Sequence, residues 1–475
     1  MGSRFDVLVV DLDNTLTKSN LLHETFWSAL SKDWLTPFKA FFSLIKGRAQ
    51  LKSTLAKIAP IDPATLPYNK EVLSYIENHR TRGGKAALVT ASNNDLALKI
   101  SEHLSIFDYA QGSCENVNLK GHKKAEVLIK LFGEKSFIYM ADSRVDLPIW
   151  KISAKAVTVG ASPNLRKSVE KINPTVEHLG TVKPDAKSYI KACRPHQWLK
   201  NALLFLPLLA AHNFSFTTII LASIGFCSFC FVSSSVYLIN DMIDLQSDRR
   251  HKTKKFRPVA AGAVPISHAT LLAALSLSLG FFFANFVNPS FTLGLTGYFA
   301  GTLGYSLIIK KLAVIDICAL AALYTARVVS GSLATGIEIS FWLIGLSIFL
   351  FLSLASIKRQ AELVEIANNN QVKISGRAYE VNDLPMVSNL ALTSGAISVL
   401  ILALYINSPA IFQLYKTPQI MWGTCFILLY WISRVVFLTN RGKMHDDPLL
   451  FALKDPLSYL CGIGILTLAL LASII

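Results

Sequence analysis

The sequence has few of the patterns that mark a zinc centre, secretion or lipidation. Its seven cysteines are scattered over 475 residues, and none has metal-ligand partners nearby. Cys227 and Cys230 form a CxxC pair inside an apolar run, so we expect packed, free thiols. The first residues lack an apolar run long enough for a signal peptide, and Asp6 stands where a myristoylation signal needs serine or threonine. We therefore expect the N-terminal part to remain on the cytoplasmic side.

Apolar residues, by contrast, make up 52% of the sequence, and several apolar runs reach the roughly 20 residues of a transmembrane helix. Lysine and arginine total 47 against 31 acids, which gives a formal net charge of +16. Such a charge suits nucleic acid, anionic lipid or a phosphorylated substrate. Because most basic residues of the C-terminal part lie next to apolar runs on one predicted side, we expect no nucleic-acid partner.

Residues 1–183 are predicted to form one α/β domain. Three short apolar runs, at residues 5–10, 85–89 and 136–140, read as buried strands separated by helical patterns. The polar side chains at their carboxyl ends are Asp11 and Asp13, Thr90 and Ser92, and Asp142 and Asp146. This order predicts a Rossmann-type parallel sheet with its site at the carboxyl ends of the strands.

Residues 18–80 lie between the first two strands and are rich in helix formers, which predicts a small helical cap. The aromatic residues in this segment are Phe26, Trp27, Phe38, Phe41 and Phe42. These aromatic side chains either form the core of the cap or a platform for substrate, and we favour the core because large aromatic side chains are usually buried.

This domain resembles the haloacid dehalogenase (HAD) superfamily of phosphohydrolases in four motifs. They read DLDNT, LVTAS, KGHKKAEVL and ADSRVD, the last with Ala141 in place of the usual glycine. The resemblance implies that Asp11 attacks phosphorus to form an aspartyl-phosphate, while Asp13 acts as general acid and then as base. It also implies that Thr90 and Lys124 hold the transferring phosphoryl group.

The same resemblance implies a magnesium site. The metal ligands that it implies are Asp11, Asp13, Asp142 and Asp146. The motif lysine has three candidates, Lys120, Lys123 and Lys124, and we favour Lys124 because the helical pattern begins there.

An acid-rich segment, YLINDMIDLQSDRRHKTKKFRP at residues 237–258, follows an apolar run long enough to cross a bilayer. Asp241, Asp244 and Asp248 are spaced by three and four residues, so a helix would place them on one face, with Asn240 one turn before Asp244. Carboxylate and amide oxygens suit Mg²⁺, which keeps open positions for substrate phosphates. The alternative is a solvated helix face followed by basic residues that anchor the chain at the membrane surface. Such an anchor, however, does not need three acids on one helix face.

The bases that follow, among them Lys254 and Arg257, would hold the remaining charge of those phosphates. NDxxDxxxD directly after a transmembrane run resembles the first aspartate motif of the UbiA superfamily of intramembrane prenyltransferases, over roughly residues 185–475. We therefore expect residues 184–475 to form an integral, all-α membrane bundle that uses Mg²⁺. The predicted linker to the first domain lies around residues 173–187.

We expect nine membrane spans. They begin near Leu199, Phe216, Ala269, Phe291, Ala313, Phe341, Ser388, Gln419 and Pro456, the first of them being short. With a cytoplasmic first domain, the connections after the second, fourth, sixth and eighth spans are cytoplasmic and hold nearly all the lysine and arginine. Only Lys416 lies on the other side, as the positive-inside rule requires, which also predicts a cytoplasmic acid-rich segment.

Further polar residues lie in or beside these spans. Asp316 is a site candidate near Tyr305 and Lys310. Arg194 and Lys200 either contact a substrate phosphate or belong to an interfacial belt. Arg327, inside an apolar span, either has a buried partner or extends toward the interface.

A second aspartate motif, DxxxD, is typical of the superfamily after its sixth helix. The matching position here holds Lys358, Arg359 and Glu362 in the string KRQAE. With RPHQWLKN and the acid-rich segment, this string resembles the decaprenyl-phosphate phosphoribosyltransferase branch. The resemblance implies transfer from phosphoribosyl diphosphate to a polyprenyl phosphate within the lipid bilayer.

Two alternatives remain open. One is transfer of a prenyl group from its diphosphate to an aromatic or quinone acceptor. The other is a lipid-binding or transport protein with a regulatory HAD domain, although we find no convincing paired repeat. If phosphoribosyl transfer occurs, the product keeps a 5-phosphate, which the HAD domain on the same chain could remove.

Overall fold

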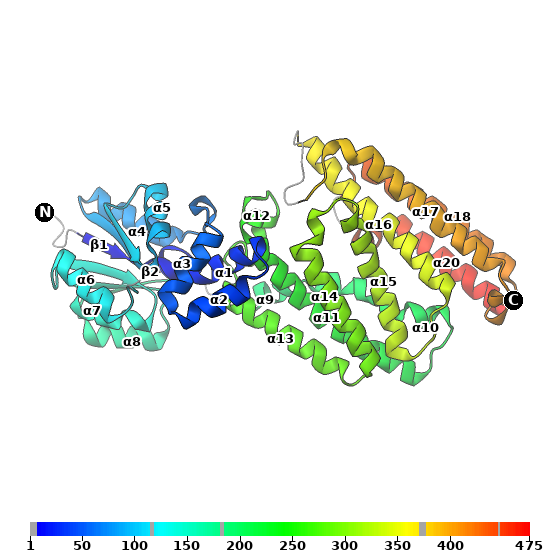
Figure 1. Cartoon of the computed structure of the whole chain (residues 1–475), viewed down its shortest axis with the longest axis horizontal. Coiled ribbons are helices and arrows are strands. Elements are labelled where there is room, and N and C mark those ends of the chain that lie inside the picture. Colours follow the sequence, from blue (N-terminus) through cyan, green and yellow to red (C-terminus); the bar gives the residue numbers. More distant parts are fainter. Residues whose placement is uncertain (1–6, 115–117, 181–184, 370–376, 445–446) are drawn as a thin grey trace. The chain divides into compact units, whose positions relative to one another are not determined.

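The computed structural model describes residues 7–114, 118–180, 185–369, 377–444 and 447–475, which belong to two compact units (Figure 1). The first unit comprises Met1–Cys193 and Tyr237–Ala273, and the second comprises Arg194–Val236 and Ala274–Ile475. The acid-rich segment therefore belongs to the first unit. The predicted boundary at residues 183 and 184 lies outside the described residues.

A six-stranded parallel sheet forms the centre of the first unit, in the order β3-β2-β1-β4-β5-β6. Its strands are β1 (Val7–Val10), β2 (Lys85–Asn93), β3 (Tyr109–Ser113), β4 (Phe137–Ala141), β5 (Lys155–Val159) and β6 (Val176–Leu179). Val7 pairs with Lys85 on one side and Phe137 on the other, so β1 is central. The predicted parallel sheet is confirmed, and the strand order reverses beside β1, where α/β sheets form their sites.

Helices cover both faces of the sheet (Figure 1). They are α4 (Lys70–Thr81) and α5 (Asn94–Leu104) on one face, and α6 (His122–Phe132), α7 (Leu147–Ile152) and α8 (Pro163–Ile172) on the other. Leu8 and Val10 pack with the α4 and α5 side, whereas Val9 packs with Trp150 and Leu128 on the opposite side. This alternation follows from the two-residue period of a strand and fixes where β1 delivers Asp11.

The cap consists of α1 (Leu21–Lys32), α2 (Thr36–Ile45) and α3 (Arg48–Ile58). Trp27 is buried, and Phe26 packs against the cap cluster of Ala29, Leu55 and Ala59. The prediction that the other aromatic residues form this core was wrong. Phe38, Phe41 and Phe42 are exposed. Helix α2 buries Thr36 instead, and the apolar side chains of the helix face outward.

Eight helices of the described chain are long and apolar enough to cross a membrane, not nine. These spans are Phe216–Ile243 (α11), Ile266–Ala284 (α13), Pro289–Lys311 (α14 and the next turn), Ile315–Thr335 (α15), Phe341–Asn368 (α16), Val381–Ile406 (α17 and the preceding turn), Pro418–Asn440 (α18 and the preceding turn) and Pro456–Ile474 (α20). The predicted first span is instead a 3-10 helix at Pro195–Phe205 followed by the five-residue α10 (Leu206–Ala210).

A close backbone contact holds this 3-10 segment against α15. A Cβ atom on Gly331 would lie 2.1 Å from the carbonyl oxygen of Leu204, so no larger residue fits there. Because a 3-10 helix rises about 2 Å per residue and an α-helix about 1.5 Å, the two pieces together extend roughly 30 Å. The segment therefore has the length of a membrane crossing without being a regular α-helical span.

Candidate active sites

The motifs that resemble the HAD superfamily meet at the carboxyl end of β1. The ammonium group of Lys124, on α6, donates a hydrogen bond of 2.8 Å to Oδ1 of Asp11, and its side chain is 2% exposed. Lys120 and Lys123 are exposed. Of the three lysine candidates, the structure therefore places Lys124 against the predicted nucleophile.

Asp11 and two neighbouring carboxylates are arranged to hold a cation. Oxygen atoms of Asp11, Asp142 and Asp146 lie within 4.8 Å of one another. Burial and the charge of Asp11 raise the pKa of Asp142 to about 8 and that of Asp146 to about 6. Because a divalent cation would relieve this repulsion, and oxygen ligands suit Mg²⁺, the group fits the predicted metal site.

Asp13 lies outside this group of three. Its carboxylate accepts hydrogen bonds from the backbone N–H of Leu21 at 2.6 Å and from the hydroxyl of Ser92 at 2.7 Å. Burial and the charge of Asp11 raise the pKa of Asp13, which favours the protonated form that a general acid needs. The hydroxyl of Thr90 is buried and accepts the N–H of Ser92, so its contact with a phosphoryl group stays a prediction.

A cavity of about 470 Å³ opens beside these carboxylates. From the cap it is lined by the basic residues His23, Arg48 and Lys52 and by the apolar residues Leu22, Leu44 and Leu51. Lys52 also donates a hydrogen bond to the carbonyl oxygen of Ala91, and burial lowers its pKa. The motifs did not reveal these cap residues, although Arg48 and Lys52 share one helix face by their four-residue spacing.

The acid-rich segment keeps a helical path across a short break. Helix α11 ends at Ile243 and α12 (Leu245–Arg250) begins two residues later. The N–H of Asp244 bonds to the carbonyl of Asn240 at 2.9 Å, and the N–H of Asp248 bonds to that of Asp244 at 2.8 Å. The four-residue hydrogen-bond spacing of an α-helix is thus maintained, so Asp244 and Asp248 lie on successive turns after Asn240.

Arg257 lies against two of these acids. Its Nη1 is 3.2 Å from Asp241 and 2.5 Å from Asp248. Oδ1 of Asn240 is buried without a hydrogen-bond partner among the described residues. A buried amide oxygen beside carboxylates suits a hard cation. Among the described residues, however, the ligand atoms of Asp241, Asp244 and Asp248 do not form a group within 4.8 Å of one another, so Mg²⁺ at this segment stays a prediction.

The neighbouring bases have different surroundings within the first unit. Arg249 donates two hydrogen bonds, of 2.7 and 3.0 Å, to Glu24 of α1, and both side chains are buried. Arg250 pairs with Asp62 at 2.5 Å, while Lys254 is exposed. Arg249 and Arg250 are therefore engaged by carboxylates of the same unit.

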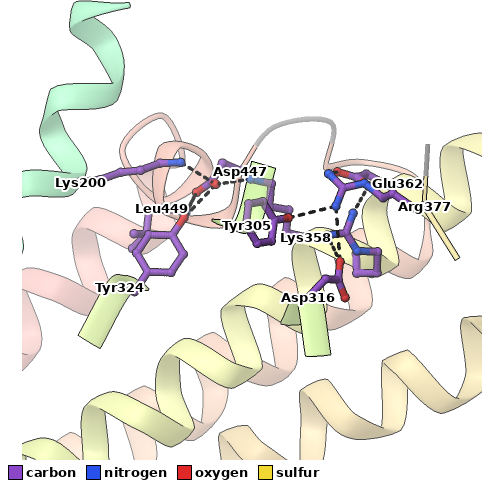
Figure 2. Close-up of polar contacts among 10 residues, drawn as sticks. Lys200, Tyr305, Asp316, Tyr324, Lys358, Glu362, Arg377, Asp447 and Leu449 are labelled. Atoms are coloured by element: carbon purple, nitrogen blue, oxygen red, sulfur yellow. Dashed lines mark hydrogen bonds and ion pairs between the residues drawn. The ribbon is translucent and has the colours of Figure 1, made fainter. Parts of the chain in front are cut away.

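In the second unit, a buried ionic group surrounds Asp316 of α15 (Figure 2). Nη2 of Arg359, on α16, lies 2.6 Å from Asp316, and neither side chain is exposed. Arg359 also contacts Glu362, one helical turn later. Arg377 lies 3.4 Å from Asp316 and donates a hydrogen bond of 3.1 Å to the hydroxyl of Tyr305. The structure thus brings together four residues predicted from the sequence and adds Arg377.

A second ionic group in the same unit surrounds Asp447, which the sequence did not reveal (Figure 2). Asp447 accepts hydrogen bonds from Lys200 at 2.7 Å and from the hydroxyl of Tyr324 at 2.9 Å, and Lys358 lies 3.2 Å away. Burial alone would raise the pKa of Asp447, but the charges of Lys200 and Lys358 hold it well below its usual range. Helix α16 therefore contributes Lys358 to this group and Arg359 to the other.

The remaining predicted residues lie in three different elements. Arg194 has a left-handed backbone at the start of the 3-10 segment, and Lys310 lies in the turn after α14. Arg327 points inward, because its Nε donates to Asn201 at 3.0 Å and its Nη2 donates to the hydroxyl of Tyr298 at 2.6 Å. The alternative that Arg327 extends toward the interface was therefore wrong.

Comparison with known proteins gives the family of the chain. Residues 202–454 match the model of the UbiA prenyltransferase family. The chain belongs to this family. The uncharacterized protein y4nM of Sinorhizobium fredii is 35% identical over 96% of this chain and 89% of its own length. Decaprenyl-phosphate phosphoribosyltransferase of Mycolicibacterium smegmatis is 31% identical over 60% of this chain and 91% of its own length.

Solved structures resemble each part of this UbiA-family chain. A UbiA homolog from Archaeoglobus fulgidus with bound GPP and Mg²⁺ is 18% identical, with a TM-score of 0.46 over 59% of this chain and 99% of its own. An apo phosphoserine phosphatase is 18% identical, with a TM-score of 0.29 over 37% of this chain and 94% of its own. These scores are low, so family membership rests on the sequence matches.

Proposed function

We propose that the UbiA part of the chain, residues 202–454, transfers a phosphoribosyl group from phosphoribosyl diphosphate to a polyprenyl phosphate. The observation that carries this proposal is the basic character of α16, where Lys358 and Arg359 stand in place of a second aspartate motif. Direct cations suit a donor that brings its own phosphates to the site. The similarity to the Mycolicibacterium smegmatis transferase, over 91% of that protein, supports the same donor and acceptor.

In this proposal, different groups of residues neutralise the negative charges of the two substrates. Mg²⁺ held by Asp241, Asp244 and Asp248 would neutralise the departing diphosphate. Lys200 and Lys358 bind phosphate oxygens, because both ammonium groups converge on one buried carboxylate and an anionic substrate could share them.

The HAD part is then a phosphatase for the transferase product. Asp11 attacks phosphorus while the bond from phosphorus to the ester oxygen breaks, and Asp13 gives its proton to the departing alcohol. Water, deprotonated by Asp13, hydrolyses the aspartyl-phosphate and releases inorganic phosphate. Lys124 orients Asp11 and offsets charge on the phosphoryl group.

A phosphatase on the same chain suits this order of reactions. Phosphoribosyl transfer leaves a lipid-linked ribose with a 5-phosphate monoester, and attachment keeps the second enzyme concentrated around that product. The order requires the HAD part and the acid-rich segment to act on the same side of the membrane, which the proposal takes to be the cytoplasmic side.

Incubation of the purified protein with Mg²⁺, labelled phosphoribosyl diphosphate and polyprenyl phosphate tests the proposal. The wild type should form the dephosphorylated lipid-linked ribose, and Asp11→Asn should accumulate its 5-phosphate. Identical lipid products from both proteins would contradict the coupling of the two activities.

Prenyl transfer to an aromatic or quinone acceptor is the second candidate, favoured by the name of the family. Labelled prenyl diphosphate with such an acceptor would then give product where phosphoribosyl diphosphate does not. If neither pair of substrates reacts, a lipid-binding or transport function becomes the favoured alternative.

A further inference from the structure

Helix α2 of the cap presents an apolar surface that the described residues of the first unit leave exposed. Phe38, Phe41 and Phe42 are 62%, 62% and 63% exposed. The exposed apolar surface continues on the large side chains of Trp34, Leu35, Leu44 and Ile45. Single exposed apolar residues are ordinary, but a contiguous set of this kind on one short segment marks an interaction surface.

The charges around this surface are basic. Lys32, Lys39, Lys46 and Arg48 are exposed at both ends of α2 and within it. The acid among them, Asp33, is neutralised by Lys39 at 2.5 Å. Apolar side chains bordered by lysine and arginine characterise helices that lie in the headgroup region of anionic membranes.

The length of α2 decides between crossing and lying on a membrane. Its 10 residues extend only about 15 Å, half of the apolar thickness of a bilayer. Trp34 lies just before the helix, and tryptophan prefers the interface between the apolar core and the headgroups. A parallel, half-inserted position is therefore the one that buries these side chains.

The apolar surface continues into the HAD cavity. Leu44 is exposed on α2 and also lines the cavity, where Leu51, Arg48 and Lys52 follow from α3. A substrate whose phosphate lies among these bases could therefore extend an attached apolar chain along Leu44 toward the exposed face.

We propose that α2, with Trp34 and Leu35, inserts its apolar side chains into an anionic leaflet and thereby presents the HAD cavity to phosphate esters carried on lipids. The proposed membrane contact does not depend on the proposed function. The proposal of a lipid-linked substrate does rest on the proposed function. A protein partner or a second copy of this chain on the same face is the competing occupant.

Photo-crosslinking in the full chain distinguishes these occupants. Phe41 is replaced by p-benzoyl-phenylalanine, and the protein is placed in nanodiscs of phosphatidylcholine with phosphatidylglycerol. As a matched control the same replacement is made at Leu98, which is 46% exposed on α5. Mass spectrometry should find lipid adducts at position 41, fewer of them without phosphatidylglycerol, and none at position 98.

Lipid adducts at both positions or at neither, or adducts to peptides of this chain or another protein, would overturn the membrane contact. A second measurement uses the triple variant Phe38→Ser, Phe41→Ser and Phe42→Ser. Hydrolysis of synthetic polyprenyl phosphoribose 5-phosphate in nanodiscs should fall about tenfold, because the apolar anchoring is lost. Hydrolysis of soluble p-nitrophenyl phosphate should stay at the wild-type rate.

An equal fall for both compounds would indicate a damaged cap and contradict the selective effect. If the wild type hydrolyses p-nitrophenyl phosphate but not the lipid compound, the proposed substrate fails. The crosslinking result at position 41 then still decides the membrane contact by itself.

Discussion

Asp316→Ala should destabilise the UbiA part more than most single substitutions. The carboxylate of Asp316 and the guanidinium of Arg359 are both completely buried, 2.6 Å apart. Removal of the carboxylate leaves Arg359 with Glu362, which is 30% exposed, and also removes a contact of Arg377. Breaking a buried ion pair costs about 3–5 kcal/mol, because the remaining charge stays desolvated.

This cost corresponds to a large shift of the unfolding temperature. One kcal/mol changes the midpoint by about 2–4 °C in a domain of roughly 150–250 residues. We therefore expect Asp316→Ala to unfold about 6–20 °C below the wild type. Tryptophan fluorescence during heating in detergent measures the difference, with both proteins heated at the same rate.

A double variant separates the charge effect from packing. Asp316→Leu combined with Arg359→Met removes both charges and replaces them with apolar side chains of similar volume. Such replacements are often neutral or stabilising, so the double variant should unfold close to the wild type. A small shift in the single variant, or equal destabilisation of both, would refute the reasoning about a desolvated pair.

The same double variant tests the role of Arg359 in transfer. If the protein regains its stability but has lost transfer activity, at least one of Arg359 and Asp316, both predicted site residues, acts on substrate. Transfer at the wild-type rate would make the pair purely structural.

Three further predictions concern the metal sites and the donor. Asp244→Ala or Asp248→Ala should abolish transfer while hydrolysis of p-nitrophenyl phosphate continues, and near-normal transfer in both would reject the Mg²⁺ assignment. Because the folded-state pKa values of Asp142 and Asp146, about 8 and about 6, exceed the ordinary value, the contribution of these two groups to metal-free stability should be fully present in acid and be lost as pH rises toward 8. Mg²⁺ should therefore raise the unfolding temperature at pH 8 but hardly at pH 5, and Asp142→Asn should remove most of this effect. Lys358→Ala should raise the KM for phosphoribosyl diphosphate about tenfold and the KM for the lipid little. Equal changes in the two KM values would mean that Lys358 serves only as a positive charge that sets the membrane orientation.

The local patterns of the sequence predicted the sheet and the position of its acids. Short β-branched runs that end in aspartate could be placed because parallel strands bring their carboxyl ends to one edge. Asp11 and Lys124 meet there, 113 residues apart. This distant pair could be predicted because Asp11 and Lys124 each lie in a motif that the sequence shows, DLDNT and KGHKKAEVL.

Other parts of the sites depend on contacts that no local pattern encodes. Asp447 meets Lys200 across 247 residues, and its surroundings in the sequence resemble an ordinary helix start. Arg48 and Lys52 reach the cavity beside Asp11 only because the cap folds over it. For the same reason, the apolar run after Arg194 gave no sign of its 3-10 geometry, which the close contact of Gly331 with Leu204 accompanies.

The error about α2 has a different physical cause. Apolar side chains were expected to be buried by protein, as they are when water is the only alternative. In the UbiA part that expectation already fails, since protein buries only 11% of the most apolar stretch of α20 and 17% of that of α14. Those helices have lipid as their solvent, so their exposed leucines and phenylalanines carry no hydrophobic cost. Phe38, Phe41 and Phe42 are as exposed as such residues, although α2 is far too short to span. In a chain that always lies beside a bilayer, exposed aromatic side chains bordered by lysine and arginine, as on α2, therefore favour contact with lipid.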